Sequence, residues 1–220
     1  MSVCALIAAF DEEESVGLVV AAVRRLVDHV VVVDDGSRDR TAAAAEAAGA
    51  EVLRHDGNRG KGAAIRSGLD RVLRGPWTHV LLLDADLQHD PGDVPALLAA
   101  GAAGCDLVLG ERTFVKGAMP TARYYSNRFG SRILSSLIGL RVSDSQSGFR
   151  LVRADRLRGL RLTATGYEIE TEMLIKLARG GASVCRVPIP ARYNGARSKL
   201  RSVRDTFRTC MLALKYRYVR

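Results

Sequence analysis

The segment that most constrains the fold is 78–90, THVLLLDADLQHD, because an apolar run leads directly into acidic residues. Val80 to Leu83 is apolar on both faces, as expected of a strand in a parallel sheet that helices cover on both sides. Asp84 and Asp86 follow at its end, and charges at such a place need a partner. With Gln88 they offer hard oxygen ligands, so we predict a site for Mg²⁺ or Mn²⁺ shared with substrate phosphates. A helix cap or a solvated turn is the alternative that this spacing leaves open.

Strand and helix patterns alternate along the chain. Strands are expected at 3–9, 30–33, 51–54, 80–83, 106–110 and 183–187. Helices are expected at 14–27, 41–48, 61–73, from 91 onward, and at 124–140, 168–179 and 202–218. Repeated βα units predict an α/β fold with a mostly parallel central sheet, helices on both faces, and a ligand site at the carboxyl ends of the strands.

Length and charge limit the organisation of the chain. With 220 residues, 47% of them hydrophobic, we expect one domain over 1–200 and a basic amphipathic C-terminal helix at 201–220. The formal net charge is +9, and the segment from Arg192 to Arg220 holds nine basic residues against Asp205 alone. Such a tail fits anionic lipid, nucleic acid or a solvated helix. No apolar stretch reaches the roughly 18 to 20 residues that span a bilayer, so membrane contact is expected to be peripheral.

The cysteines give an expectation about the compartment. Cys4, Cys105, Cys185 and Cys210 are far apart in the sequence and include no C-x-x-C pair. No signal peptide precedes the first predicted strand. We therefore expect a reduced, cytoplasmic setting.

Several motifs occur together in a fixed order: IAAFDEEE, VVVDDGSRDRT, NRGKGAAIRSGL, LDADLQHDP, GER, SQSGFR and YNGARSKL. With these motifs, the stretch from about Val3 to Leu200 resembles the family 2 glycosyltransferases. It is most similar to the polyprenyl-phosphate (dolichyl-phosphate) mannosyl and glucosyl transferases. The resemblance implies a GT-A fold, a nucleotide-sugar donor, inverting transfer and a lipid-phosphate acceptor.

The resemblance also implies roles in donor binding. Asp84, Asp86 and Gln88 match the family's metal motif, where the cation bridges the two donor phosphates as a Lewis acid. The other residues expected to bind the donor are Asp11 and Glu12 at the nucleoside, Asp34 and Asp35 at the base and ribose, and Lys61 and Arg66 at the phosphates. Asp11 departs from the family's usual Asn. For Asp34 and Asp35 an ordinary turn is the alternative reading.

Catalysis and acceptor binding are assigned in the same way. Arg112 and Arg128 match positions expected to grip the acceptor phosphate, since a guanidinium binds an oxyanion through two hydrogen bonds. Glu111 departs from the family, which commonly has a small residue there. Gln146 lies in the 142–150 loop expected to cover the donor sugar, with Asp144 and Ser147. Arg197 and Lys199 resemble a late phosphate-binding loop. The residues expected to act in the reaction itself are Asp86, Arg112, Arg128 and Gln146.

The leading interpretation is transfer of mannose or glucose, from GDP-mannose or UDP-glucose, to a polyprenyl phosphate. It places the protein at the inner face of the cell membrane, held by an anionic surface. A hydroxyl acceptor remains an alternative, because the acid-rich stretch with Glu168, Glu170 and Glu172 offers a general base. A sugar-1-phosphate nucleotidyltransferase would need a glycine-rich amino-terminal signature, which 3–14 lacks. A nucleic-acid partner is not expected, because aromatic residues make up only 5% of the chain.

Overall fold

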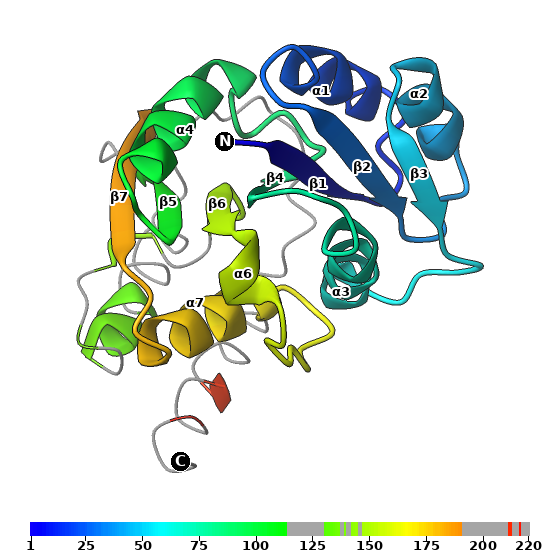
Figure 1. Ribbon diagram of the computed structural model, residues 1–220. Coiled ribbons are helices and arrows are strands. Elements are labelled where there is room, and N and C mark those ends of the chain that lie inside the picture. Colours follow the sequence, from blue (N-terminus) through cyan, green and yellow to red (C-terminus); the bar gives the residue numbers. More distant parts are fainter. Residues whose placement is uncertain are drawn as a thin grey trace.

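Strands and helices alternate from the amino terminus of the computed structural model (Figure 1), which describes residues 1–113, 130–136, 139, 142–144, 147–190, 211, 212 and 216. The first four βα units are β1 (Val3–Ala9), α1 (Val16–Val23), β2 (His29–Asp34), α2 (Thr41–Ala47), β3 (Glu51–Arg54), α3 (Lys61–Val72), β4 (His79–Asp84) and α4 (Val94–Ala102). The elements that follow are β5 (Leu107–Thr113), β6 (Arg150–Arg153), α6 (Ala154–Leu157), α7 (Ile169–Arg179) and β7 (Val184–Pro190).

The described strands form one seven-stranded sheet in the order β3-β2-β1-β4-β6-β5-β7. Every neighbouring pair is parallel except the two that involve β6. The register pairs Ala8 of β1 with Asp84 of β4, and Ala9 of β1 with Asp34 of β2. The acidic residues that end β2 and β4 therefore lie at the same edge of the sheet.

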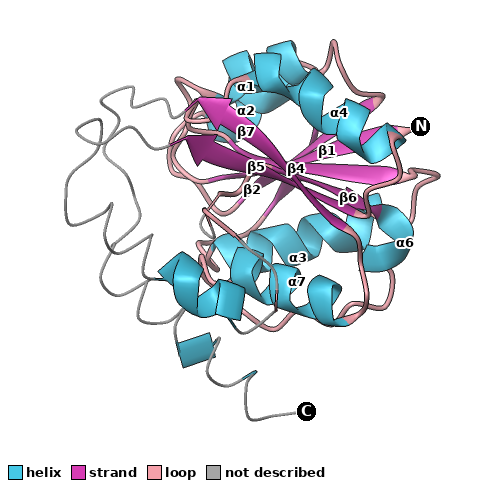
Figure 2. Ribbon diagram, turned by 90° about the vertical axis from the view of Figure 1, so that its left-hand side faces the viewer, coloured by secondary structure: helices cyan, strands magenta, loops and turns pink. Residues whose placement is uncertain are grey.

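Helices cover the sheet on both faces, as the buried strands require. Figure 2 shows α1, α2 and α4 on one side and α3, α6 and α7 on the other. Alternate residues of one strand enter different cores, so that Leu6 packs toward α3 while Ile7 packs in the core that includes residues of α1 and α4. The predicted α/β fold with a mostly parallel sheet is confirmed.

The later part of the chain differs from expectation in detail. The helix predicted from Pro91 begins with a 3₁₀ turn at Pro91–Asp93 before α4. Neither β6 nor α6 was predicted. β6 has four residues and opens with Arg150, which is fully buried and donates to the backbone carbonyls of Ser147 and Glu170. A strand that begins with a buried arginine does not show the hydrophobic pattern from which strands are predicted.

The expectation of reduced cysteines is wrong for one pair. Cys105 and Cys185 are separated by 80 residues, yet they form a disulfide with their Cα atoms 6.0 Å apart. The reason is topological, because β7 lies directly beside β5 and so carries Cys185 to the beginning of β5. Cys4 is a free, buried thiol, and burial raises its pKa to about 12.

Two predicted helices lie largely outside the described residues. Within 124–140, residues 130–136 are helical, and within 202–218 only positions 211, 212 and 216 are described. Among the residues that the structure describes, no helix has the length and apolar character to cross a membrane. The division into 1–200 and 201–220 stays a prediction.

Candidate functional site

A tight turn carries the acidic motif away from the end of β4. Asp84 is the last residue of β4, and Oδ1 of Asp86 accepts the backbone N–H of Gln88 at 3.0 Å. Leu87 between them has a φ of 59°, a left-handed conformation that a residue with a side chain adopts only under constraint. Burial and the charge of Asp84 raise the pKa of Asp86 to about 6. The two carboxylates therefore repel each other, and a cation between them would relieve the repulsion.

The chain itself supplies a cation to this motif. Nζ of Lys61, at the start of α3, lies 2.6 Å from Oδ1 of Asp84 and 2.6 Å from Oε1 of Glu170. Only 14% of the Lys61 side chain is exposed. Burial acts to lower its pKa, but the two carboxylates outweigh burial and raise it. In the same way Lys61 holds the pKa of Asp84 below its ordinary value, although burial acts in the opposite direction.

His89 and Glu170 belong to this cluster, and the sequence interpretation assigned neither of them to the site. Nε2 of His89 lies 4.0 Å from Oδ2 of Asp84, and its ring stacks on Phe149 with centroids 5.2 Å apart. Burial lowers the pKa of His89 to about 4, so the imidazole is neutral at physiological pH. The sequence could have indicated His89, because it lies within the motif LDADLQHDP. Glu170 was named only as a potential base, and its pairing with Lys61 depends on contact between distant segments.

Two residues at the end of β5 contact the loop at 142–144. Arg112 donates from Nε to Oδ2 of Asp144 at 2.6 Å and from Nη2 to Oδ1 at 3.0 Å. The Asp144 side chain is fully buried. The preceding residue, Glu111, accepts the backbone N–H of Ser143 at 2.9 Å. This contact explains the acidic residue where the family commonly has a small one. Two consecutive residues of β5 therefore fix 142–144, and acceptor binding by Arg112 stays a prediction.

A cavity of about 430 Å³ opens beside the ends of β1 and β2. The residues that line it include Phe10, Asp11, Ser37, Arg38, Asp56 and Asn58. It lies at the same edge of the sheet as Asp34 and Asp84, where a doubly covered parallel sheet binds its ligands. Its lining carries aromatic, carboxylate, amide and guanidinium groups, which match the mixed surface of a nucleoside.

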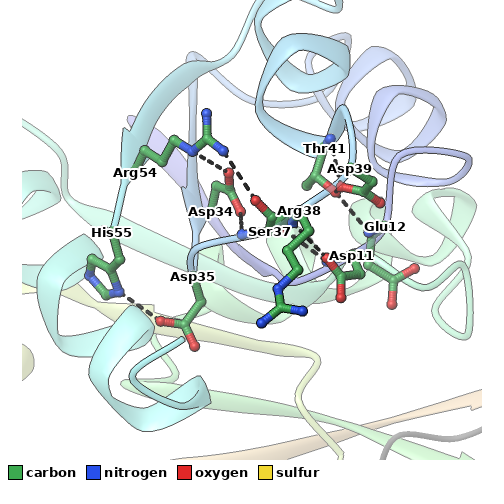
Figure 3. A network of polar contacts seen from close by, with 10 residues as sticks. All are labelled: Asp11, Glu12, Asp34, Asp35, Ser37, Arg38, Asp39, Thr41, Arg54 and His55. Carbon is green, nitrogen blue, oxygen red and sulfur yellow. Dashed lines mark hydrogen bonds and ion pairs between the residues drawn. The ribbon is translucent and has the colours of Figure 1, made fainter. Parts of the chain in front are cut away.

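Asp11 and Glu12 are held by the turn that follows β2 (Figure 3). The backbone N–H of Asp11 donates to Oγ of Ser37 at 2.9 Å, and its Oδ1 accepts the N–H of Arg38 at 3.0 Å. Asp11 also has a positive φ of 50°. The N–H of Glu12 donates to Oγ1 of Thr41 at 2.8 Å. The structure therefore places Asp11 at the cavity and gives Glu12 a link to α2.

Asp34 stabilises the turn that follows β2. It is fully buried, its Oδ1 accepts the N–H of Ser37 at 2.9 Å, and its Oδ2 lies 3.3 Å from Nε of Arg54. The turn reading considered for Asp34 thus describes its contacts (Figure 3).

Asp35 binds the loop that leads into α3. It accepts the backbone N–H groups of Arg59 at 3.0 Å and Gly60 at 2.8 Å, and Nδ1 of His55 lies 2.7 Å from its Oδ1. Nε2 of His55 in turn lies 3.0 Å from Oγ of Ser67. Asp35 is 3% exposed, so contact with a base or ribose, which stays a prediction, needs a different arrangement of this loop.

The glycines at the start of α3 make room for another part of the chain. A Cβ at Gly60 would lie 2.5 Å from the carbonyl oxygen of Thr165, and one at Gly62 would lie 2.4 Å from that of Ala164. The N–H of Gly62 donates to Thr165 at 2.8 Å, and Arg66 donates to the carbonyl of Ala164. In the structure these groups thus bind the backbone carbonyls of 164–165. Binding of donor phosphates by Arg66 stays a prediction.

Four predicted site residues lie outside the described part of the chain: Arg128, Gln146, Arg197 and Lys199. Among the remaining ones the structure brings together Lys61, Asp84 and Asp86. Within the described ranges, no group of three or more His, Cys, Asp or Glu side chains is arranged to hold a metal. Asp84 and Asp86 alone are an incomplete ligand set, as Mg²⁺ commonly has when substrate phosphates and water complete its shell.

The chain is similar in sequence to known proteins. Residues 4–160 match Glycosyl transferase family 2. The glycosyltransferase AglJ of Haloferax volcanii is 32% identical over 209 residues, 93% of this chain and 68% of that protein. The undecaprenyl-phosphate mannosyltransferase of Micrococcus luteus is 34% identical over 202 residues, 86% of this chain and 83% of that protein.

A solved structure has the same fold. It is glucosyl-3-phosphoglycerate synthase of Mycobacterium tuberculosis in complex with Mn²⁺, uridine diphosphate and phosphoglyceric acid, with a TM-score of 0.80 and 22% identity. The match covers 100% of this chain and 79% of that chain. The match of residues 4–160 and the two relatives agree with the α/β sheet and the acidic turn at its edge, so the chain belongs to glycosyl transferase family 2.

Proposed function

We propose that this glycosyltransferase moves a hexose, mannose or glucose, from a nucleotide diphosphate sugar to a polyprenyl phosphate, with inversion at the sugar carbon. The observation that carries the proposal is the cluster of Lys61, Asp84 and Asp86 at the same sheet edge as the nucleoside-sized cavity. The similarity to the undecaprenyl-phosphate mannosyltransferase supports the acceptor class. We further propose that the reaction takes place at the cytoplasmic face of the membrane.

The donor would lie across this edge. The donor would be GDP-mannose or UDP-glucose, and its nucleoside would occupy the cavity beside Asp11 and Arg38. Its diphosphate would then lie toward Asp84 and Lys61, whose ammonium is a strong donor to an oxyanion. Because two carboxylates hold Lys61, its ammonium would be oriented and charged before the diphosphate binds.

Mg²⁺ or Mn²⁺ would be held by Asp84 and Asp86, with Gln88 the predicted third ligand. The raised pKa of Asp86, caused by burial and by Asp84, marks a place where added positive charge is favourable, so the residues fit a divalent cation. The related fold that contains Mn²⁺ and uridine diphosphate supports this choice. When bound, the metal would neutralise the leaving nucleoside diphosphate as a Lewis acid.

The acceptor would be bound by cationic side chains. A phosphate monoester is anionic at neutral pH, so it needs to be positioned rather than deprotonated. We propose that Arg112 and Arg128 grip it, with Arg197 and Lys199 nearby and Gln146 over the donor sugar. Arg112 is already oriented by the buried carboxylate of Asp144, which limits the conformations of its guanidinium.

A hydroxyl acceptor is a second candidate that one observation favours. The carboxylate of Glu170 lies 2.6 Å from Nζ of Lys61, inside the same cluster, and a hydroxyl acceptor needs a carboxylate there as its general base. In that case the acceptor would be a glycan or a small molecule.

A screen for product release tests the proposal. GDP-mannose and UDP-glucose are each supplied with Mn²⁺ or Mg²⁺, and with a short polyprenyl phosphate, a polyprenol or a free sugar as acceptor. Release of nucleoside diphosphate that depends on the polyprenyl phosphate supports the first candidate. Release that depends on an alcohol instead supports the second one, and no release with any pair contradicts both.

A further inference from the structure

Glu172 of α7 is a fully buried carboxylate that does not touch the cavity. It accepts the backbone N–H of Thr163 at 2.9 and 3.1 Å, the hydroxyl of Thr163 at 2.9 Å and the backbone N–H of Ala164 at 2.8 Å. Its remaining donors are Nζ of Lys176 at 2.7 Å and the hydroxyl of Tyr216 at 2.9 Å. Such a set of charge-assisted bonds fixes the backbone at 163–164 in one place.

That backbone segment covers the first turn of α3. Gly60, the residue before the helix, has no side chain to satisfy the first N–H groups, and the N–H of Gly62 donates to Thr165. Both glycines allow 164–165 to approach more closely than any side chain would permit. The segment 163–165 is therefore the surface against which α3 begins.

The start of α3 also determines where Lys61 lies. Lys61 is the first residue of the helix, and its ammonium meets Asp84 and Glu170 at 2.6 Å each. A change in the position of the first turn would move Nζ relative to Asp84. The geometry links Glu172 to Lys61 through 163–165, with no direct contact between them.

We propose that Glu172 is a positioning residue for donor binding, because it holds 163–165 against the first turn of α3 and so fixes Lys61 beside Asp84. The proposal rests on the proposed function only in assigning the place beside Asp84 to the donor diphosphate. Tyr216 adds one of the hydrogen bonds to Glu172, which ties the C-terminal segment to the same arrangement.

The test compares Glu172→Gln with Asp106→Asn. Asp106 is also a buried carboxylate, and it accepts from Ser183 at 2.9 Å and Arg156 at 3.0 Å. It lies before β5, at the end of the strand away from the site. Both changes weaken a buried hydrogen-bond network, but only Glu172 contacts 163–164.

Two readouts are measured on the full chain. The first is KM and kcat with GDP-mannose and UDP-glucose. Glu172→Gln is expected to raise the donor KM about tenfold, which is the effect of losing one charged hydrogen bond between Lys61 and the donor diphosphate. The value of kcat should change far less. The second is hydrogen exchange, in which the amide of Gly62 should exchange faster in Glu172→Gln than in the unaltered protein. Asp106→Asn should leave both readouts unchanged.

Two milder variants keep the proposal testable if Glu172→Gln folds poorly. Tyr216→Phe removes one hydrogen bond and should raise the donor KM in the same direction by a smaller factor. Gly62→Ala pushes a Cβ against Ala164 and should raise the donor KM as well. Because the two positions act on one segment, combining Gly62→Ala with Glu172→Gln should raise KM by less than the product of the separate effects.

Equal effects of Glu172→Gln and Asp106→Asn on donor KM, or an unchanged exchange rate at Gly62, would overturn the proposal. If the unaltered protein uses neither donor, the proposed function fails, and the exchange rate at Gly62 still decides the role of Glu172. If the unaltered protein transfers hexose while Glu172→Gln keeps its donor KM, the proposed function holds and this inference is wrong.

Discussion

The ammonium of Lys61 lies 2.6 Å from Oδ1 of Asp84, so the acidic motif at the end of β4 is paired with the first residue of α3. Glu170 contacts the same ammonium from α7 at 2.6 Å. One cation thus joins three elements that are distant in sequence. The pair is partly buried, and it connects the place proposed for the donor diphosphate with the packing of α3 and α7.

Replacing Lys61 by Gln leaves the buried carboxylate of Glu170 and the partly buried carboxylate of Asp84 without their cation. The free energy of unfolding should fall by about 3–5 kcal/mol, as is typical when one partner of a buried ion pair is removed. Urea denaturation at pH 7 measures this change. Arg71→Gln is the control, because Arg71 is 45% exposed in its pair with Glu51 and should cost no more than about 1 kcal/mol. Equal losses in the two variants would contradict the role of Lys61.

The ionisation of Glu172 predicts a pH dependence of stability. Burial acts to raise its pKa, but hydrogen bonds from Lys176, Ala164, Thr163 and Tyr216 outweigh burial and lower it from 4.5 to about 2. A carboxyl group with a lowered pKa stabilises the fold above its unfolded pKa, and this stabilisation is lost as the pH falls from about 4.5 to 2.

The difference in unfolding free energy between the unaltered protein and Glu172→Gln should therefore shrink by about 3 kcal/mol over that interval. Denaturation curves of both proteins at pH 7, 4, 3 and 2 measure it. A difference that stays constant with pH would mean that the carboxylate has an ordinary pKa in the folded protein.

Arg112 is expected to serve the acceptor through its planar guanidinium. Arg112→Lys keeps the charge but loses the two-fold hydrogen bonding, worth roughly 1.5 to 3 kcal/mol, so acceptor-dependent transfer should fall about tenfold or more. Hydrolysis of the donor without acceptor is measured in parallel and should change little. A matched variant is Arg153→Lys, whose side chain is 41% exposed near Asp106. If donor hydrolysis and transfer fall together, Arg112 serves the donor or the 142–144 loop instead.

The basic tail is expected to bring the enzyme to an anionic membrane. Each Lys or Arg near such a surface adds up to about 1 kcal/mol, and salt weakens the attraction. Deletion from Ser202 onward should abolish co-sedimentation with anionic liposomes at low salt, while the full chain sediments and is released as salt rises. Neutral liposomes are the control. Sedimentation that survives the deletion and ignores salt would place membrane contact elsewhere.

The fold was predictable where burial alone determines the pattern. β1, β2 and β4 are mostly apolar or β-branched runs between turns, and all three were expected close to their observed bounds. β6 was not, because it begins with the buried Arg150, which donates to the backbone carbonyls of Ser147 and Glu170. A four-residue antiparallel strand that opens with a charge resembles a loop in sequence.

The site was predictable in its residues more than in its contacts. Asp84, Asp86 and Lys61 were expected at the edge of the sheet, and the structure brings them together. The sequence could not reveal that Asp35 binds the N–H groups of Arg59 and Gly60, because these contacts depend on the path of a loop. Arg66 was expected at the donor phosphates, whereas in the structure it donates to the carbonyl of Ala164.

Transfer of labelled hexose to a short polyprenyl phosphate, with Mn²⁺ present or chelated, tests the central claim most directly. The full chain should form lipid-linked hexose from GDP-mannose or UDP-glucose only when metal and acceptor are both present. Asp86→Asn should remain folded, because burial and Asp84 disfavour the charge that it removes, and should lower this rate by about a hundredfold or more. Absence of lipid-linked product with both donors, or an undiminished rate in Asp86→Asn, would contradict the account.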